Sequence, residues 1–292
     1  MNNRSLFSLV ILITAFLIGL PGCSTRKKLT KREREKIRLA QVRPHKNKKI
    51  DRLTFDEAKQ VYEYYKKHGE TKQRTAIIAR MVTLSTDHDV IEPLLHELAD
   101  LTFETQNYAK AEEFYAQYAA MYPGSSSIDF VKSQHIEAAY QQISLPQRDQ
   151  SKTKEIIALA DNFINSFSPK NPFMQRVLAI RQTCYFNLME SEVNQILFYL
   201  HRYDVFNNPK SLESAWQRLM YMNRSVLPYV TNAKVQAVHQ AMSAQETTAE
   251  TTDRSTPDRA SIEGFLMPLR MMIRKHAQEQ LPAHKHPWRN RF

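Results

Sequence analysis

The stretch that most constrains the fold runs from Leu94 to Pro123 and predicts two antiparallel helices joined by a tight turn. In its first half, four apolar residues between positions 94 and 99 fall on one helical face. In its second half, Ala111, Tyr115 and Ala119 follow one another at four-residue spacing. Pro123 then ends the second helix. One such pair cannot bury its own apolar face, so further helices must stack on both sides of it.

The same stretch resembles the tetratricopeptide repeat, a helix pair of 34 residues in which a proline closes the unit. The resemblance implies an all-α fold, a tetratricopeptide-like α-solenoid of about five helix pairs over residues 54–242. The composition agrees with a helical chain, because only 5 of the 292 residues are glycine. So few glycines argue against a β-rich fold with many tight turns.

Local signals set the expected helix boundaries. Thr54 and Glu57 form a capping-box pattern before the first helix, and Gly69 follows its end. A polar linker is expected over 243–261, followed by a C-terminal helix and a basic tail over 262–292. Pro268 is either a kink in that last helix or its start. The other helices outside the opening stretch are expected at 71–84, 127–143, 152–167, 173–189, 192–203, 209–221 and 228–242.

The N-terminus carries the marks of an export signal. An apolar run of 15 residues, Leu6–Leu20, is shorter than the ~20 residues of a membrane-spanning helix and suits a signal peptide over 1–22. The next residues, Leu20 to Cys23, resemble a bacterial lipobox, which implies cleavage before Cys23 and acylation of that residue. By resemblance to known sorting rules, Ser24 favours the outer membrane, with the protein facing the periplasm. The alternative is an uncleaved helix with an incidental cysteine.

The segment after the lipobox holds most of the positive charge. The whole chain has a net charge of +11, yet Ser24–Arg52 alone contains 13 Lys/Arg against 3 Asp/Glu. Few large apolar residues accompany them, so we expect a lipidated, basic and flexible linker over 23–53. It is either a solvated tether or a contact for anionic lipid headgroups, and nucleic acid is not an expected partner.

A second stretch, Arg148–Arg202, resembles the BamD family, lipoproteins of the machinery that assembles outer-membrane β-barrels. The resemblance covers the region from Phe55 to Arg202, and this chain departs from the family pattern after Arg202. The residues that carry it are Arg148, Asp149, Gln150, Thr153, Phe163, Phe167, Pro172, Arg181, Cys184, Leu188, Glu192, Phe198, Tyr199, Leu200 and Arg202.

This resemblance implies a non-catalytic scaffold at the outer membrane. The first repeats would bind unfolded outer-membrane proteins, and the later ones would dock on the POTRA domain of a BamA-like β-barrel protein, alongside other assembly lipoproteins. A different class shares the anchor and the repeats. It comprises tetratricopeptide lipoproteins of pilus or secretion assembly, or of peptidoglycan coordination.

Binding residues are expected on the first helix of each pair, which lines the concave face in tetratricopeptide folds. A groove that mixes an aromatic ring with charges suits an extended peptide. Each of these residues is alternatively an ordinary solvated side chain. The candidates are Lys59, Glu63, Lys66, Lys67, His96, Asp100, Phe103 and Glu104.

No catalytic or cofactor motif is present in the sequence. It contains neither a P-loop nor a G-x-G-x-x-G run. His284 and His286 could bind a metal but lack a third ligand, so a metal site is not expected. Cys184 lies on an apolar helical face and is expected to be a buried, inert thiol. The sequence therefore predicts a binding protein with no enzymatic activity and no cofactor.

Overall fold

The computed structural model describes residues 48–230, 233–249 and 258–280, and within these ranges the fold is all-α. Ten α-helices and two short 3-10 helices follow one another without a strand in the described part of the chain. The α-helices are α3 (Phe55–His68), α4 (Thr71–Leu84), α5 (His88–Glu104), α6 (Tyr108–Met121), α7 (Ile128–Tyr140), α8 (Ser151–Ser166), α9 (Met174–Phe206), α10 (Pro209–Ser225), α11 (Ala233–Ala249) and α12 (Arg259–Gln280).

The predicted signals at the first helix are confirmed. The Thr54 side chain accepts a hydrogen bond from the Glu57 backbone N–H while the Glu57 carboxylate binds the Thr54 backbone, completing the capping box. Gly69 ends α3 in the left-handed conformation, with φ 70°. Just before α3, the 3-10 helix η1 (Ile50–Arg52) leads to Leu53, which is 2% exposed. The end of the expected linker is thus part of the folded unit, and residues 23–47 lie outside the described part.

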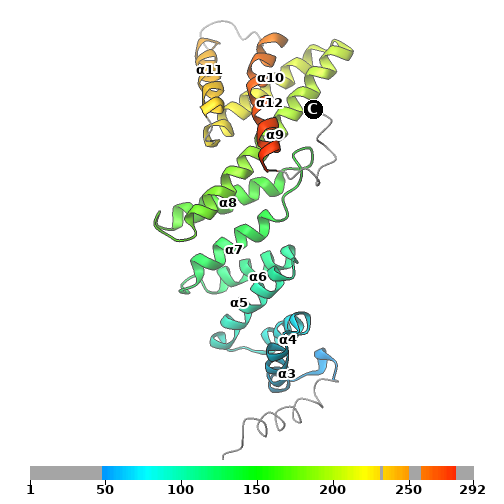
Figure 1. The fold of residues 1–292 in the computed structure, drawn as a ribbon, viewed down its shortest axis with the longest axis vertical. Helices are drawn as coiled ribbons and strands as arrows, with labels where there is room; N and C mark the ends of the chain where they lie inside the picture. Colours follow the sequence, from blue (N-terminus) through cyan, green and yellow to red (C-terminus); the bar gives the residue numbers. More distant parts are fainter. Residues whose placement is uncertain (1–47, 231–232, 250–257, 281–292) are drawn as a thin grey trace, which may run out of the picture.

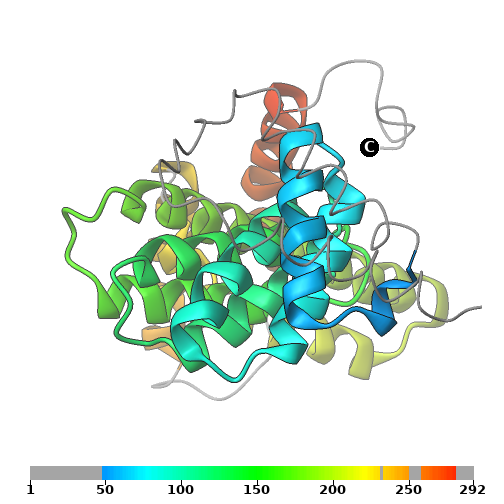
Figure 2. The same ribbon diagram turned by 90° about the horizontal axis from the view of Figure 1, so that it is seen from below.

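The helices are stacked in chain order along the long axis of an elongated molecule. Figure 1 shows α3 and α4 at one end, α5 to α8 in the middle, and α10, α11 and α12 at the other end. Each helix from α3 to α10 packs against the next one along the chain. Figure 2 looks along that axis, with α3 in front and the later helices behind it.

Two hydrophobic cores fill this stack, and α7 contributes to both. The first core extends from Leu53 to Ala138 and includes Val131 of α7. The second begins with Ile136 of α7 and continues to Met272 of α12. Opposite faces of one helix of 13 residues therefore join the two halves of the molecule.

The prediction of separate helices at 173–189 and 192–203 is wrong. The structure has one helix of 33 residues, α9, across both segments. Residues 190–192 are polar, but neither glycine nor proline is present there to break a helix. Ser191 and Glu192 are instead buried, and the Glu192 carboxylate accepts a hydrogen bond from Arg218 of α10 at 3.3 Å.

The C-terminal helix begins earlier than expected and belongs to the second core. Pro268 lies inside α12, so of the two alternatives, a kink or the start of the helix, the start is wrong. Ile262, Leu266 and Leu269 are each at most 1% exposed, and α12 contacts α9, α10 and α11. The expected linker at 243–261 is narrower, because α11 continues to Ala249. Among the described helices, none is long and apolar enough to cross a bilayer.

Candidate functional site

A polar network joins the first three helices around Glu97 of α5. The Tyr62 hydroxyl of α3 donates to Glu97 Oε2 at 2.6 Å, and Arg74 Nε of α4 donates to Oε1 at 2.8 Å. Lys66 Nζ donates to the Tyr62 hydroxyl at 3.0 Å. Burial, and then the hydrogen bond to Glu97, raise the pKa of Tyr62. Like an ordinary tyrosine, Tyr62 is protonated at neutral pH, and its hydroxyl donates to Glu97.

Aromatic rings continue from this network toward the middle of the stack. His96, beside Glu97, has its ring 5.4 Å from that of Tyr118 and 5.5 Å from that of Phe130, which belongs to α7. Phe130 in turn meets Phe173, just before α9, edge to face at 5.6 Å. Two groups of contacts therefore meet at the adjacent residues His96 and Glu97 of α5. We call the six residues the aromatic–charged row: Tyr62, Lys66, His96, Glu97, Phe130 and Phe173.

The structure brings some of the sequence-predicted residues to this row. Lys66 and His96 belong to it, and Asp100 Oδ2 lies 3.7 Å from His96 Nε2. Asp100 also accepts a hydrogen bond from the buried Tyr115 hydroxyl at 2.7 Å. Phe103 packs its ring edge to face on Tyr108 and, like Phe130 of the row, lies half-buried against the first core. The remaining four candidates are exposed: Lys59, Glu63, Lys67 and Glu104.

Sequence reasoning missed several members of the row. The ring of Tyr62 is buried in the first core, whereas its hydroxyl reaches Glu97 of α5. No local pattern around Phe130 or Phe173 predicts that their rings meet. Phe130 lies in the first turn of α7 and Phe173 lies just before α9, so each ring finds its partner in another helix. Only the stacking of α5, α7 and the start of α9 brings these rings together.

A second surface lies at the C-terminal end of α9. Phe198 is 59% exposed, Val205 is 58% exposed and Phe206 is 71% exposed. Phe198, Arg202 and Val205 follow helical i, i+4, i+7 spacing and so share one side of the helix. We call Phe198, Arg202, Val205 and Phe206 the α9 tip. Exposed apolar side chains on one side of a helix make this end of α9 a candidate interaction surface.

Most residues of the BamD-like stretch have structural roles. Gln150 Oε1 accepts hydrogen bonds from the hydroxyl of Thr153 and from Nδ2 of Asn187, both at 2.8 Å, which fixes the loop before α8. Phe163 and Phe167 pack with ring centroids 4.6 Å apart. Cys184 is fully buried, and burial raises the pKa of its thiol to about 12, as expected for an inert thiol.

A cluster of charges lies where α6, α7 and α8 meet. Glu112 accepts hydrogen bonds from Lys152 of α8 and from Gln142 Nε2, the latter at 2.6 Å. His135 Nε2 of α7 lies 4.0 Å from Glu112. Burial alone would lower the pKa of Lys152, but its hydrogen bonds to Glu112 and Glu155 and the charges of these two carboxylates together raise it. The cluster therefore holds α6, α7 and α8 together through contacts between charged and polar side chains.

Within the described ranges, no group of three or more His, Cys, Asp or Glu side chains could hold a metal ion. Cys23, His284 and His286 lie outside the described residues. No protein-family model matches the sequence, and no curated protein is significantly similar to it. The function must therefore be argued from the surfaces themselves and from the residues that carry the resemblance.

Proposed function

We propose that the protein is a BamD-like scaffold, a lipid-anchored tetratricopeptide-like solenoid that binds unfolded outer-membrane proteins and a BamA-like barrel protein without chemistry of its own. The observation that carries the proposal is the aromatic–charged row: side-chain contacts join α3 to α5 at Glu97, and join α5 to α7 and the start of α9 at the adjacent residue His96. Rings and charges along successive helices suit an extended chain that alternates apolar and polar residues. The lipobox at Cys23 and the stretch Arg148–Arg202 support the placement in this family.

The two surfaces would have different ligands. The row would hold segments of the unfolded substrate. The α9 tip, which begins inside the BamD-like stretch and continues past Arg202 to Phe206, would dock on the POTRA domain of the barrel protein. Binding both at once raises the effective concentration of substrate near the machine that inserts it, and weak individual contacts then suffice.

A pull-down from detergent-solubilised membranes tests the docking partner. The tagged full-length chain should co-purify a BamA-like barrel protein, and Phe206→Ser should reduce its recovery. Leu145→Ser is the matched control, because Leu145 is also exposed, at 42%, but lies in the loop before α8. If no barrel protein is recovered, or only pilus, secretion or peptidoglycan proteins are, the proposal is wrong.

Cross-linking tests the substrate surface. A photo-reactive residue at position 66 should capture an unfolded outer-membrane protein in cells, whereas one at position 72, exposed on α4, should not. Equal capture at both positions would contradict a role for the row.

The anchor is tested separately by fractionation. Cys23→Ala should release the protein from the outer-membrane fraction, since acyl chains are its expected hold on the bilayer. Full retention of the variant in that fraction would show that Cys23 is not the anchor.

A further inference from the structure

The middle of α9 carries two polar side chains that have no partner within the described part of the chain. Glu190 is half-buried, and burial raises the pKa of its carboxyl, with neither a hydrogen bond nor a neighbouring charge contributing. One turn farther along, Asn194 Nδ2 is buried and has no hydrogen-bond partner among the described residues. Buried polar groups in folded proteins are normally hydrogen-bonded, so two unsatisfied groups one turn apart need an explanation.

This pair belongs to a face of α9 that leads to the α9 tip. Glu190, Asn194, Leu197 and His201 follow i, i+4, i+7, i+11 spacing, and we call these four residues the α9 flank. Leu197 packs against the second core, whereas His201 is exposed. Phe198 of the tip lies one turn beyond Asn194 and is 59% exposed. The Glu190 carboxylate therefore lies two helical turns from an exposed aromatic ring.

Glu192, on the same helix, shows how the fold satisfies a buried carboxylate. It is 4% exposed and accepts a hydrogen bond from Arg218 Nη1 of α10 at 3.3 Å. Burial raises the pKa of Glu192, and the charge and the hydrogen bond of Arg218 oppose that shift. Residues two apart on a helix do not share a face, so Arg218 does not serve Glu190. Among the described residues, no cation opposes the burial of Glu190.

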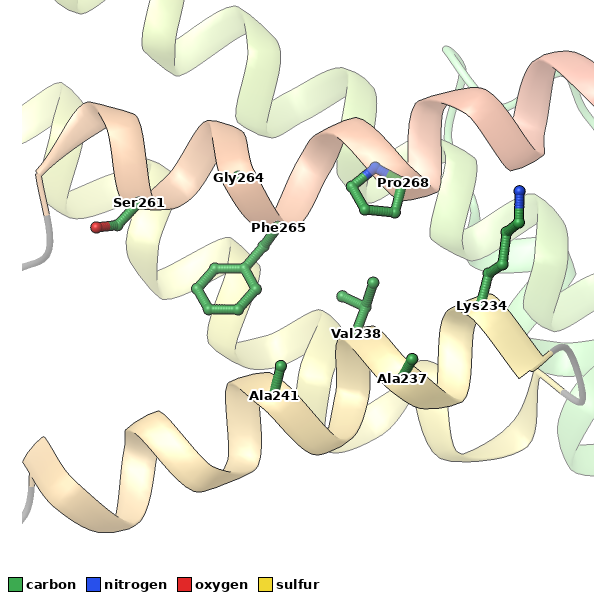
Figure 3. Close-up of a pocket in the computed structure, with 8 residues that line it drawn as sticks. All are labelled: Lys234, Ala237, Val238, Ala241, Ser261, Gly264, Phe265 and Pro268. Atoms are coloured by element: carbon green, nitrogen blue, oxygen red, sulfur yellow. The ribbon is translucent and has the colours of Figure 1, made fainter.

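The α9 flank differs in this respect from the groove between α11 and α12, which Figure 3 shows. That groove has a volume of about 480 Å³ and is lined mainly by small and apolar side chains, among them Ala237, Ala241 and Phe265. Apolar surface alone does not distinguish one partner from another. A half-buried carboxylate does, because a partner must present a donor or a cation to satisfy it.

We propose that the α9 flank docks a partner protein that places an arginine or lysine side chain against Glu190 and apolar residues against Phe198 and Val205. A charge-assisted hydrogen bond is stronger where part of the surrounding water has already been removed. The apolar residues then exclude further water around the pair, as at the centre of protein interfaces. This inference rests on the proposed function, because it specifies the chemistry of the surface that docks at the α9 tip.

Photo-cross-linking of the full-length protein in cells tests the contact. A photo-reactive residue at position 201, exposed on the flank, should capture the partner. Adding Glu190→Lys to this chain should reduce the captured amount at least about tenfold, because it sets two cations against each other. Glu113→Lys makes the same change at an exposed carboxylate of α6 and should leave the captured amount as it was.

Exchanging the charges identifies the chemistry of the partner. Mass spectrometry should find a lysine or arginine near the cross-linked site of the partner, and its replacement by glutamate should restore capture by the Glu190→Lys chain. Loss and restoration with a protein other than a barrel protein would uphold this inference and contradict the proposed function. Equal capture by the Glu190→Lys chain, failure of the restoration, or no capture at position 201 would overturn the inference. A barrel protein recovered in the pull-down would still uphold the proposed function in those cases.

Glu190→Gln separates binding from folding. The neutral amide keeps the shape of the side chain and removes a charge that burial disfavours, so Tm of the free protein should rise by about 2 °C at pH 8. Capture at position 201 should nevertheless fall at least about fivefold, because the partner's cation loses its counter-charge. A purely structural residue would not give these opposite effects. A lower Tm would show that the carboxylate already stabilises the free fold, and this result would overturn the proposal.

Discussion

Glu112 on α6 shows how single charged residues hold neighbouring helices of the stack together. Its side chain is only 13% exposed, and it is bound by Lys152 of α8 and Gln142 at the end of α7. A mostly buried carboxylate is tolerated only when such partners replace its hydration. Removing it would leave the amine of Lys152, 27% exposed, without its closest counter-charge.

Glu112→Gln should therefore destabilise the protein by about 1 to 3 kcal/mol, the cost of leaving a partly buried charged donor without its partner. Urea unfolding of the full-length protein measures the effect. The control is Glu113→Gln, the next residue on α6, whose side chain is exposed and which should change the stability by less than about 0.5 kcal/mol. Equal effects of the two variants would show that the contacts of Glu112 do not stabilise the packing of these helices.

His135 gives the same cluster a dependence on pH. Burial lowers the pKa of His135; Glu112 and Glu155 oppose this shift, and Lys152 adds to it. An unfolded histidine has a pKa of about 6.5, so the unfolded chain binds more protons below that pH than the folded chain does. Stability should consequently fall as the pH drops below about 6.5, until the folded pKa is passed.

His135→Gln should flatten this dependence between pH 6.5 and 5, as measured by thermal unfolding across the range. His201→Gln, at an exposed histidine of α9, is the control and should leave the slope as it is in the unmodified protein. An unchanged slope in the His135 variant would show that other groups cause the loss of stability in acid.

Among the elements, α12 has the most unusual pair of faces. One face of α12 is buried in the second core, and the adjacent face carries the exposed side chains of Met267 and Met271. A terminal helix with this arrangement covers apolar surface that the last repeat of a stack would otherwise expose. The buried face of α12 therefore stabilises this end of the stack, while Met267 and Met271 remain exposed to solvent.

Substitutions at two neighbouring residues of α12 distinguish its buried face from its exposed face. Leu266→Ala should cost about 2 to 5 kcal/mol, because Leu266 is 1% exposed and its truncation leaves a cavity. Met267→Ala should change stability by less than about 0.5 kcal/mol, because Met267 is 58% exposed. Thermal unfolding distinguishes them, and a similar loss in both would mean that α12 does not pack as described.

The sequence predicted helices well where local chemistry determines them and poorly where distant contacts do. The capping box at Thr54, the left-handed Gly69 and the boundaries of α4 could all be read from nearby residues. The continuity of α9 could not, because Glu192 is compatible with a helix interior only once Arg218 of α10 lies beside it. The candidate site divides in the same way. Helical periodicity predicted that Lys66 and His96 lie in it, whereas Glu97 and Phe130 join it only through contacts with helices packed beside them.

At the scale of the whole molecule, the two cores should respond separately to damage. Leu95 is fully buried in the first core and Ile196 in the second. Ile136 of α7 also belongs to the second core, but it lies on the helix that both cores share. Local stability in a stacked array depends on the repeat and its nearest neighbours, so effects should fade with distance.

Hydrogen exchange tests this separation. Leu95→Ala should speed amide exchange mainly in α3 to α6, and Ile196→Ala mainly in α9 to α12, each at a cost of about 2 to 5 kcal/mol. Ile136→Ala should raise exchange on both sides of α7. Uniform acceleration along the chain in all three variants would instead indicate a single cooperative unit.

The sharing of α7 also bears on how the chain acquires its structure as it is synthesised. The first core needs nothing beyond Ala138, so it can close while the second half of the chain is still emerging. The second core requires residues from Ile136 to Met272 and remains open until α12 arrives. A chain that ends before α12 would therefore display a finished amino-terminal half and an uncovered carboxy-terminal one, the kind of partly folded product that chaperones retain and proteases remove.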